Sequence, residues 1–269
     1  MLLERLSSLR SVLVAYSGGV DSTLLAVAAH AVMGSSCLAV LALSDTYPPS
    51  EADSARSTAA ALGLRVMEVE TNELADPRFR ANGPDRCYHC KSELFGLLKT
   101  VAEVRGLEHV ADGSNADDDA DHRPGARAAA ELDILTPLRD VGMTKAHVRD
   151  VARMLDLPNW DKPSMACLAS RFPYGCEITS EDLERVMLAE DGLRALGLRQ
   201  SRVRAHGEVA RVEVGADEMQ RAWESRAQVL EAVRAGGFPY VALDLEGYRS
   251  GSMNDVLAPE ERKTAREGA

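Results

Sequence analysis

Residues 17–22 form a short polar turn, SGGVDS, between an apolar run and an Ala/Leu-rich stretch. Gly18 and Gly19 let main-chain N–H groups approach an anion without a Cβ in the way, and the start of a helix adds partial positive charge. Further hydroxyl donors here belong to Ser17, Ser22 and Thr23. Asp21 would repel a phosphate, and a bridging divalent cation resolves that conflict. The alternative is an ordinary helix start that Asp21 or Ser22 caps.

Three cysteines form a second candidate site. Cys87 and Cys90 lie three residues apart in RCYHCK, where a helix is predicted to begin, so both thiolates can face one point and the helix terminus lowers thiol pKa values. Cys167 lies far along the chain. Three interpretations are open: a 4Fe–4S cluster with one open iron, a Zn²⁺ site for which His89 is poorly placed as fourth ligand, or a redox dithiol. Cys37, in an apolar strand, is interpreted as a buried hydrophobic residue.

Composition excludes several classes of protein. The 31 Lys and Arg residues against 42 Asp and Glu give a net charge of −11, which argues against a sequence-independent grip on nucleic acid. No apolar run reaches the ~18 residues of a membrane span, and the N-terminus MLLERLSSLR does not have the form of a signal peptide. We expect a cytoplasmic protein with no membrane or nucleic-acid partner. The five cysteines, an odd number, argue against a framework of disulfides. Disorder is expected only at the C-terminal end, ERKTAREGA.

Alternating strands and helices are predicted to position these groups. Strands are predicted at 11–16, 37–43, 65–69 and 109–112, and helices at 22–33, 49–62, 91–105 and 144–155. This order is typical of βαβ units with a parallel sheet. A stretch with two prolines at 161–175 marks a domain boundary, so an α/β domain (1–172) and a small α+β domain (173–269) are predicted. The second has helices at 180–196 and 217–235 and strands at 202–205, 210–214 and 240–245.

SGGVDS resembles the pyrophosphate loop of the adenine-nucleotide alpha hydrolases, the PP-loop superfamily of ATP pyrophosphatases. Neither G-x-x-x-x-G-K-[ST] nor G-x-G-x-x-G occurs in the chain, so Walker-type and dinucleotide loops are excluded. The resemblance implies a turn that holds the β- and γ-phosphates of ATP with Mg²⁺, while an acceptor oxygen attacks the α-phosphorus. It also implies nucleotide contacts at two strand ends, in 41–48 with Ser44 and in 112–118 with Gly113. For residues 117–119 a solvated polar loop is the preferred interpretation.

Five motifs between residues 17 and 254 are similar to those of the LarE family of ATP-dependent sulfur transferases: SGGVDST, RCYHCK, WDKPSMACLASRFPYG, RVRAHGEVARVEV and DLEGYRSGSMN. The likeness covers nearly the whole chain and implies sulfur insertion during biosynthesis of the nickel-pincer nucleotide. The substrate would be pyridinium-3,5-biscarboxylic acid mononucleotide, whose carboxylate is adenylylated before sulfur displaces AMP to leave a thiocarboxylate. Adenylylation is needed because a free carboxylate is a poor electrophile.

The family has two sources of sulfur. One branch sacrifices the sulfur of a single cysteine at the ACLASR position, and the other uses three cysteines to bind a 4Fe–4S cluster that carries an extra sulfide. Cys87, Cys90 and Cys167 match the second pattern, so the resemblance implies cluster-dependent, catalytic transfer. Cys176 is not part of the pattern and is interpreted as a bystander.

The resemblance also points to residues that surround the chemistry. Candidates to orient Cys167 or to bind the anionic substrate are Lys162, Ser170 and Arg171. In the small domain, Arg202 and Arg204 share one face of a strand and suit a phosphate, and Glu190 is a candidate for a metal or a phosphate-linked water. The alternatives are a structured interdomain loop for the first three residues and a surface ion-pair network for the others.

Three other functions remain open: a PP-loop tRNA thiolase, a non-catalytic nucleotide sensor with structural Zn²⁺, and an ATP-dependent amide-forming ligase. The acidic charge argues against the first, and the last would not need the cysteines. The family resemblance further implies a homo-oligomer, while the sequence does not identify a sulfur donor.

Overall fold

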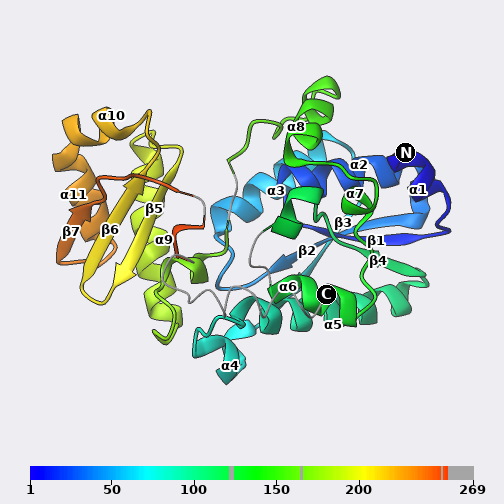
Figure 1. The fold of residues 1–269 in the computed structure, drawn as a ribbon, viewed down its shortest axis with the longest axis horizontal. Helices are drawn as coiled ribbons and strands as arrows, with labels where there is room; N and C mark the ends of the chain where they lie inside the picture. The colour runs from blue at the N-terminus through cyan, green and yellow to red at the C-terminus, as the bar shows by residue number, and fades with distance from the viewer. Residues whose placement is uncertain (121–123, 164–165, 250, 254–269) are drawn as a thin grey trace. The chain divides into compact units, whose positions relative to one another are not determined.

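The computed structural model describes residues 1–120, 124–163, 166–249 and 251–253 (Figure 1). The expectation of a disordered C-terminal end falls outside these residues. The chain divides into two compact units. The first holds the described residues of Met1–Glu73 and Cys87–Met165, and the second those of Leu74–Arg86 and Ala166–Arg262. The domain boundary expected between residues 172 and 173 stays a prediction.

The first unit is built on a four-stranded, all-parallel sheet in the order β3-β2-β1-β4. Its strands are β1 (Val12–Tyr16), β2 (Cys37–Leu43), β3 (Val66–Glu70) and β4 (His109–Ala111). Leu13 of β1 pairs in parallel register with Leu38 of β2 and with Val110 of β4. The predicted parallel α/β architecture is therefore confirmed for this unit.

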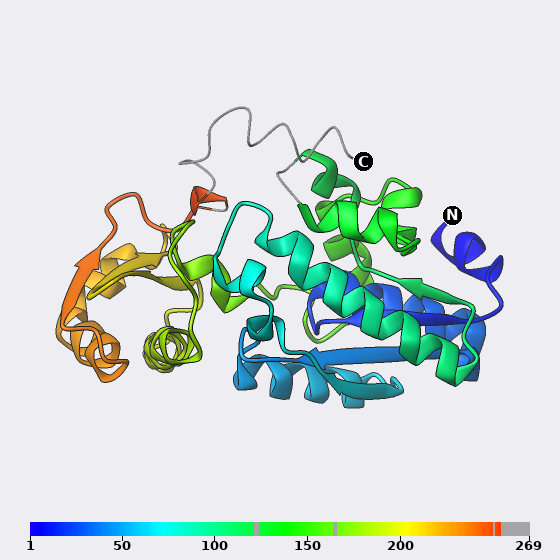
Figure 2. The same cartoon turned by 90° about the horizontal axis from the view of Figure 1, so that it is seen from below.

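Helices cover both faces of this sheet, and they bury β1 and β2 on both sides. Their side chains alternate, so that Val12, Val14 and Tyr16 join one core while Leu13 joins the other. The first core includes residues of α1 (Leu2–Ser7), α2 (Val20–Met33), α3 (Pro49–Ala61), α7 (Pro137–Asp140) and α8 (Lys145–Met154). The second includes residues of α5 (Arg86–Arg105) and α6 (Pro124–Glu131), and Figure 2 shows α5 running along that face.

The second unit contains a mixed three-stranded sheet in the order β5-β6-β7. Strands β5 (Ser201–His206) and β6 (Val209–Val214) are antiparallel, and β7 (Tyr240–Leu243) pairs with β6 in parallel. The helices are α4 (Pro77–Arg80), α9 (Ser180–Ala195), α10 (Met219–Glu224) and α11 (Arg226–Ala235). The single helix predicted at 217–235 is wrong, because Ser225 separates two helices there.

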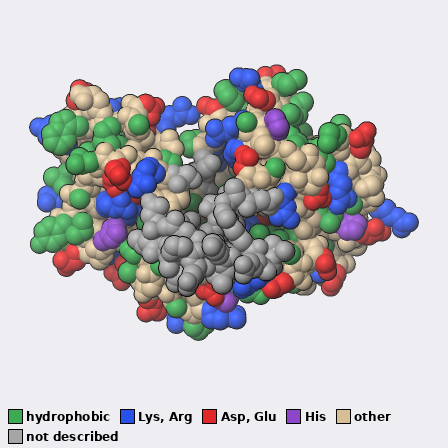
Figure 3. All heavy atoms as spheres, in the orientation of Figure 1, with side chains coloured by type: hydrophobic (Ala, Val, Ile, Leu, Met, Phe, Trp, Pro, Cys, Tyr) green, Lys and Arg blue, Asp and Glu red, His purple; other side chains and the backbone are tan. Residues whose placement is uncertain are grey.

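Two further observations concern the distribution of surface charge and the character of the helices. On the face shown in Figure 3, Lys and Arg side chains are interspersed with Asp and Glu side chains among the described residues. Within the described part of the chain, no helix combines the length and the apolar character that crossing a membrane requires.

Candidate functional site

The glycine turn, residues 17–19, connects the carboxyl end of β1 to α2. Gly18 has φ +64°, and a Cβ there would lie 2.5 Å from the Cβ of Ala55, so both the backbone and the space require glycine. Gly19 is the N-cap of α2, and no side chain of the described residues caps that helix. The alternative in which Asp21 or Ser22 caps the helix is thus wrong. The first N–H groups of an uncapped helix are suitable donors to an anion.

Ser17 and Ser22 shape the turn from within. The Ser17 N–H donates to Ser22 Oγ at 3.1 Å, and Ser22 Oγ donates to the Gly19 carbonyl at 3.1 Å. The two hydroxyl oxygens are 3.1 Å apart. Ser17 is exposed and Ser22 is buried, so Ser17 is the hydroxyl that a bound phosphate could reach.

Asp21, the predicted Mg²⁺ ligand, faces two partners that the sequence analysis missed. Its Oδ2 forms an ion pair with Lys145 Nζ, and its Oδ1 accepts a hydrogen bond from Asn115 Nδ2 at 3.2 Å. Lys145 is placed by a capping box at the start of α8, in which Thr144 Oγ1 accepts from the His147 N–H. The turn therefore combines a carboxylate, an ammonium group and uncapped N–H groups in one place.

The loop after β4 packs against the first turn of α2. A Cβ on Gly113 would lie 2.9 Å from the backbone nitrogen of Ser22, so only glycine allows this approach. Asp112 accepts from the Ser114 N–H at 2.8 Å and pairs with Lys91 Nζ at 2.8 Å. Burial raises the pKa of Asp112, but Lys91 and Ser114 outweigh it and hold that pKa below its usual value. Burial lowers the pKa of Lys91, but the charge and the hydrogen bond of Asp112 raise that pKa above its usual value overall.

The following short 3₁₀ helix, Ala116–Ala120, contains the acidic residues for which a solvated loop was preferred. Asp117 is exposed, and its Oδ2 accepts from the Lys145 N–H at 2.8 Å. Asp118 Oδ2 accepts from the Asn115 N–H at 3.0 Å. These carboxylates order the loop locally.

Ser44 lies just after the end of β2, but its hydroxyl is directed at a buried carboxylate. Ser44 Oγ donates to Glu73 Oε1 at 2.8 Å, and Thr46 Oγ1 donates to the same oxygen. Thr71 Oγ1 donates to Glu73 Oε2 at 3.3 Å. Glu73 is 4% exposed and was missed by the sequence analysis. It fixes the loop in which nucleotide contacts are predicted, while a contact from Ser44 itself stays a prediction.

Lys162 lies against the glycine turn in the first unit. Its Nζ pairs with Glu51 at 2.8 Å and donates to Ser54 Oγ at 3.1 Å, with the Gly18 carbonyl 3.5 Å away. Asn159, a residue that the sequence analysis did not single out, also contacts this turn. The orientation of Cys167 by Lys162 stays a prediction.

None of the five cysteines forms a disulfide, and they differ in their surroundings. Cys87 and Cys90 are the second and fifth residues of α5, which begins five residues earlier than predicted, and both are half-buried. Cys167 is half-buried, at the N-cap of a 3₁₀ helix, Leu168–Arg171. Cys87 and Cys90 belong to the first unit and Cys167 to the second. Thiols are suitable ligands for an iron–sulfur cluster, but the described residues contain no group of three or more His, Cys, Asp or Glu residues placed to hold a metal.

Cys37 and Cys176 should differ strongly in reactivity. Burial raises the pKa of the Cys37 thiol to about 11, whereas Cys176 is exposed. Because the thiolate is the nucleophile, iodoacetamide at pH 8 is expected to label Cys176 at least about tenfold faster than Cys37 in the folded protein. Peptide mass spectrometry over time checks this order, and equal labelling rates in the folded protein would contradict it.

A buried ion pair holds the loop after Cys167 in the second unit. Arg171 Nε and Nη2 donate to Glu190 Oε1 and Oε2 at 2.8 and 2.9 Å, and Arg171 Nη1 donates to the carbonyls of Ala166 and Cys167. Ser170 Oγ donates to the Cys167 carbonyl at 2.9 Å. Arg171 and Ser170 therefore shape the backbone at Cys167.

Arg202 and Arg204 lie on β5 and are also buried. Arg204 donates to the Ser170 carbonyl at 3.0 Å and to Glu213 Oε2 at 2.7 Å, while the Arg202 guanidinium lies 5.1 Å from the centre of the Tyr248 ring. Burial and the charge of Arg171 lower the pKa of Arg202. Arg204 and Glu213 form a buried ion pair, so the alternative of a surface network is wrong. Phosphate binding by the two arginines and metal binding by Glu190 stay predictions.

The Glu190 carboxylate should stabilise the second unit only above acidic pH. Burial raises its pKa, but the charge and hydrogen bonds of Arg171, the charge of Arg202 and the Val203 N–H lower it overall. A lowered pKa means that the stabilisation is present above the ordinary carboxyl pKa of about 4.3 and is lost as the pH falls. Replacing Glu190 by Gln is expected to lower the free energy of unfolding at pH 7 by about 3 kcal/mol or more, because Arg171 stays buried without its counter-charge.

Urea unfolding at pH 7 and at pH 4 checks this prediction. The difference between wild type and E190Q should shrink at the lower pH, and Glu246→Gln, in an exposed pair with Arg249, serves as control. If the two proteins differed in free energy of unfolding as much at pH 4 as at pH 7, the predicted pH dependence of the Glu190 stabilisation would be wrong.

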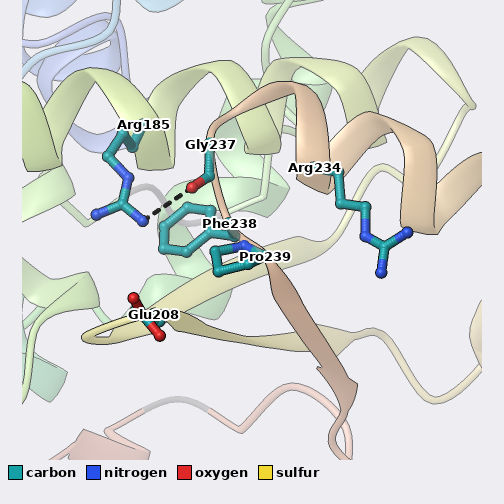
Figure 4. A pocket seen from close by; sticks show the side chains of 6 residues that line it. All are labelled: Arg185, Glu208, Arg234, Gly237, Phe238 and Pro239. Carbon is teal, nitrogen blue, oxygen red and sulfur yellow. Dashed lines mark hydrogen bonds between the residues drawn. The ribbon is translucent and has the colours of Figure 1, made fainter.

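A surface pocket of about 580 Å³ lies elsewhere in the second unit, and it contains none of the predicted site residues (Figure 4). Arg185 donates to the Gly237 carbonyl at 3.1 Å and lies over the Phe238 ring, which gives this concavity a structural origin.

The all-parallel sheet, with a glycine turn at the carboxyl end of β1, defines an α/β protein. A subunit of the glutamine-hydrolyzing GMP synthase from Methanopyrus kandleri is 30% identical over 162 residues, which are 56% of this chain and 51% of that protein, and the similarity suggests a PP-loop fold. No family model matches the chain.

Two relatives match nearly the whole chain. An uncharacterized protein of Synechocystis, slr1717, is 44% identical over 96% of this chain and 99% of its own length. The pyridinium-3,5-bisthiocarboxylic acid mononucleotide synthase of Lactiplantibacillus plantarum is 37% identical over 98% of this chain and 96% of its own length. The chain therefore belongs to the LarE family.

Proposed function

We propose that this chain is an ATP-dependent sulfur transferase that converts the carboxylates of pyridinium-3,5-biscarboxylic acid mononucleotide to thiocarboxylates, a step in nickel-pincer nucleotide biosynthesis. The synthase of L. plantarum carries the bisthiocarboxylic product in its name. The observation that carries the proposal is the glycine turn, whose uncapped helix start lies beside Asp21 and Lys145. Such a group can bind the triphosphate of ATP together with Mg²⁺.

In the proposed reaction, a substrate carboxylate oxygen attacks the α-phosphorus of ATP, the bond to the β-phosphate oxygen breaks, and pyrophosphate leaves. Asp21 would hold Mg²⁺, and the N–H groups at the start of α2 would face the phosphates. The resulting mixed anhydride has AMP as its leaving group, and a sulfur nucleophile that attacks the carbonyl carbon releases AMP. In this proposal the Asp21–Lys145 ion pair would open or rearrange when Mg²⁺ binds, and Lys145 would then pair with a phosphate.

The sulfur is proposed to come from a 4Fe–4S cluster with Cys87, Cys90 and Cys167 as ligands. When bound, such a cluster would supply a transferable sulfide at its open iron. Two thiols three residues apart at the start of α5 support this assignment. Arg86 directly precedes Cys87, and Ala169 follows Cys167 by two residues. Within the second unit, the Arg86 side chain donates a hydrogen bond to the Ala169 carbonyl at 2.8 Å. The cytoplasmic location, a homo-oligomer and the absence of nucleic-acid partners remain predictions from the sequence.

An anaerobic incubation with ATP, Mg²⁺ and the pyridinium dicarboxylate mononucleotide tests the proposal. We expect AMP, pyrophosphate and a product heavier by about 16 Da for each oxygen exchanged for sulfur. Iron and acid-labile sulfide are measured on the same sample. AMP release without a mass change would contradict sulfur transfer, and mass change without iron would contradict the cluster. A gel shift with bulk tRNA examines the thiolase alternative.

A further inference from the structure

The carbonyl group of Gly18 is held by a buried side chain from a distant part of the first unit. Asn159 Nδ2 donates to the Gly18 carbonyl oxygen at 3.0 Å and to Thr23 Oγ1 at 2.9 Å. Asn159 is 5% exposed, and its Oδ1 has no hydrogen-bond partner among the described residues. A carbonyl oxygen can only accept a hydrogen bond, so Asn159 must face Gly18 with its Nδ2 amide group and not with Oδ1.

The same turn also packs against α3. A Cβ on Gly18 would lie 2.5 Å from the Cβ of Ala55, and the Tyr16 hydroxyl donates to the Ala55 carbonyl at 2.9 Å. Asn159, which bonds to both Gly18 and Thr23, thus holds the turn to the start of α2 beside this contact with α3.

This contact has a consequence for the next N–H group. In a trans peptide the C=O of one residue and the N–H of the next point in opposite directions. Holding the Gly18 carbonyl toward Asn159 therefore directs the Gly19 N–H to the other side, where the exposed Ser17 hydroxyl lies 3.5 Å away. Two adjacent glycines offer little steric resistance to rotation of this peptide, and a rotated carbonyl oxygen would repel a phosphate.

We propose that Asn159 is a positioning residue that fixes the Gly18–Gly19 peptide so that the Gly19 N–H faces a phosphate of ATP. The proposal rests on the proposed function, since it concerns the ATP bound there. Lys162 contributes a weaker contact to the same carbonyl, because Nζ is 3.5 Å away and its charge is paired with Glu51. The role of Asn159 is to orient an N–H donor without touching the substrate.

Asn159→Asp is the sharpest test, since it keeps the shape of the side chain and replaces the N–H donor by an acceptor. We expect the KM for ATP in the pyrophosphate-release assay to rise at least about tenfold, with a smaller change in kcat, and the ATP-induced increase in Tm to be lost. Asn159→Ser, a shorter donor with no charge, is expected to raise KM less. It also keeps the test available if the aspartate variant folds poorly.

Ser11→Ala is the matched control. Ser11 is a buried hydroxyl in the same unit, directly before β1 and away from its carboxyl end, where its Oγ accepts from the Glu108 N–H at 2.9 Å. It should lower Tm and leave the KM for ATP unchanged. Folded N159D and N159S proteins with wild-type KM would overturn the proposal for Asn159 alone. A wild-type protein that neither binds ATP nor releases pyrophosphate would overturn the proposed function and this role of Asn159 with it.

Discussion

Replacing Cys167 by Ser is expected to abolish thiocarboxylate formation while substrate-dependent pyrophosphate release continues. The two results separate because the proposed adenylylation uses the glycine turn and Asp21, whereas sulfur transfer needs the thiol. A serine hydroxyl neither ligates a cluster as thiolate does nor supplies sulfur. Mass spectrometry of the product and a pyrophosphate assay, run on one anaerobic sample, measure both steps.

Single replacements of the other cysteines distinguish the two sources of sulfur. Under the cluster proposal Cys87→Ser and Cys90→Ser also lose transfer and iron, while Cys37→Ala and Cys176→Ser retain both. If Cys167 sacrificed its own sulfur, the Cys87 and Cys90 variants would complete one turnover per chain, and Cys167 would lose about 34 Da as dehydroalanine forms. Loss of activity in C176S with intact iron would contradict the interpretation of Cys176 as a bystander.

Replacing Asp21 by Asn is expected to lower kcat/KM for pyrophosphate release by about 100-fold or more, roughly 3 kcal/mol of transition-state stabilisation. The amide keeps the shape of the carboxylate but binds Mg²⁺ weakly. It also leaves Lys145 without its negative partner. Initial rates over a range of ATP and Mg²⁺ concentrations measure the loss, and excess Mg²⁺ should restore part of it.

Asp53→Asn serves as control for the Asp21 variant, because Asp53 pairs with Arg56 on the exposed side of α3. It should retain wild-type kinetics. An Asp21→Asn protein with a wild-type dependence on Mg²⁺ would show that the carboxylate is not the metal ligand and would leave it the contacts with Lys145 and Asn115.

The sequence predicted the parts of the site whose residues are adjacent in the chain. SGGVDS and RCYHCK could be found because their spacing alone defines a turn and a helix start, and the alternation of apolar runs predicted each strand of the parallel sheet. Lys145, Glu73 and Asn159 could not be found in this way. Each is a single ordinary polar residue, and its role comes from a contact with a residue far away in sequence.

Three local details also depended on tertiary structure. The short helices α4 and α7 contain four residues each, too few for a periodic pattern. Helix α5 begins at Arg86 because that guanidinium is buried and bonded to Asn82 and Ala169, an influence that the local sequence does not contain. The sequence also did not indicate the burial of Arg202 and Arg204 on β5, for which phosphate binding is the prediction and a surface ion-pair network the alternative.

The peptide chain passes between the two units after Glu73, after Arg86 and after Met165. The second unit is therefore discontinuous in sequence, and a fragment that starts near residue 166 would leave out the segment that carries Asn82 and Arg86. Nδ2 of Asn82 donates to the Pro173 carbonyl at 2.8 Å, so such a fragment would expose an acceptor that is satisfied in the intact protein. Producing this unit on its own would require a circular permutation or a fusion that joins residues 74–86 to the C-terminal part by a new linker.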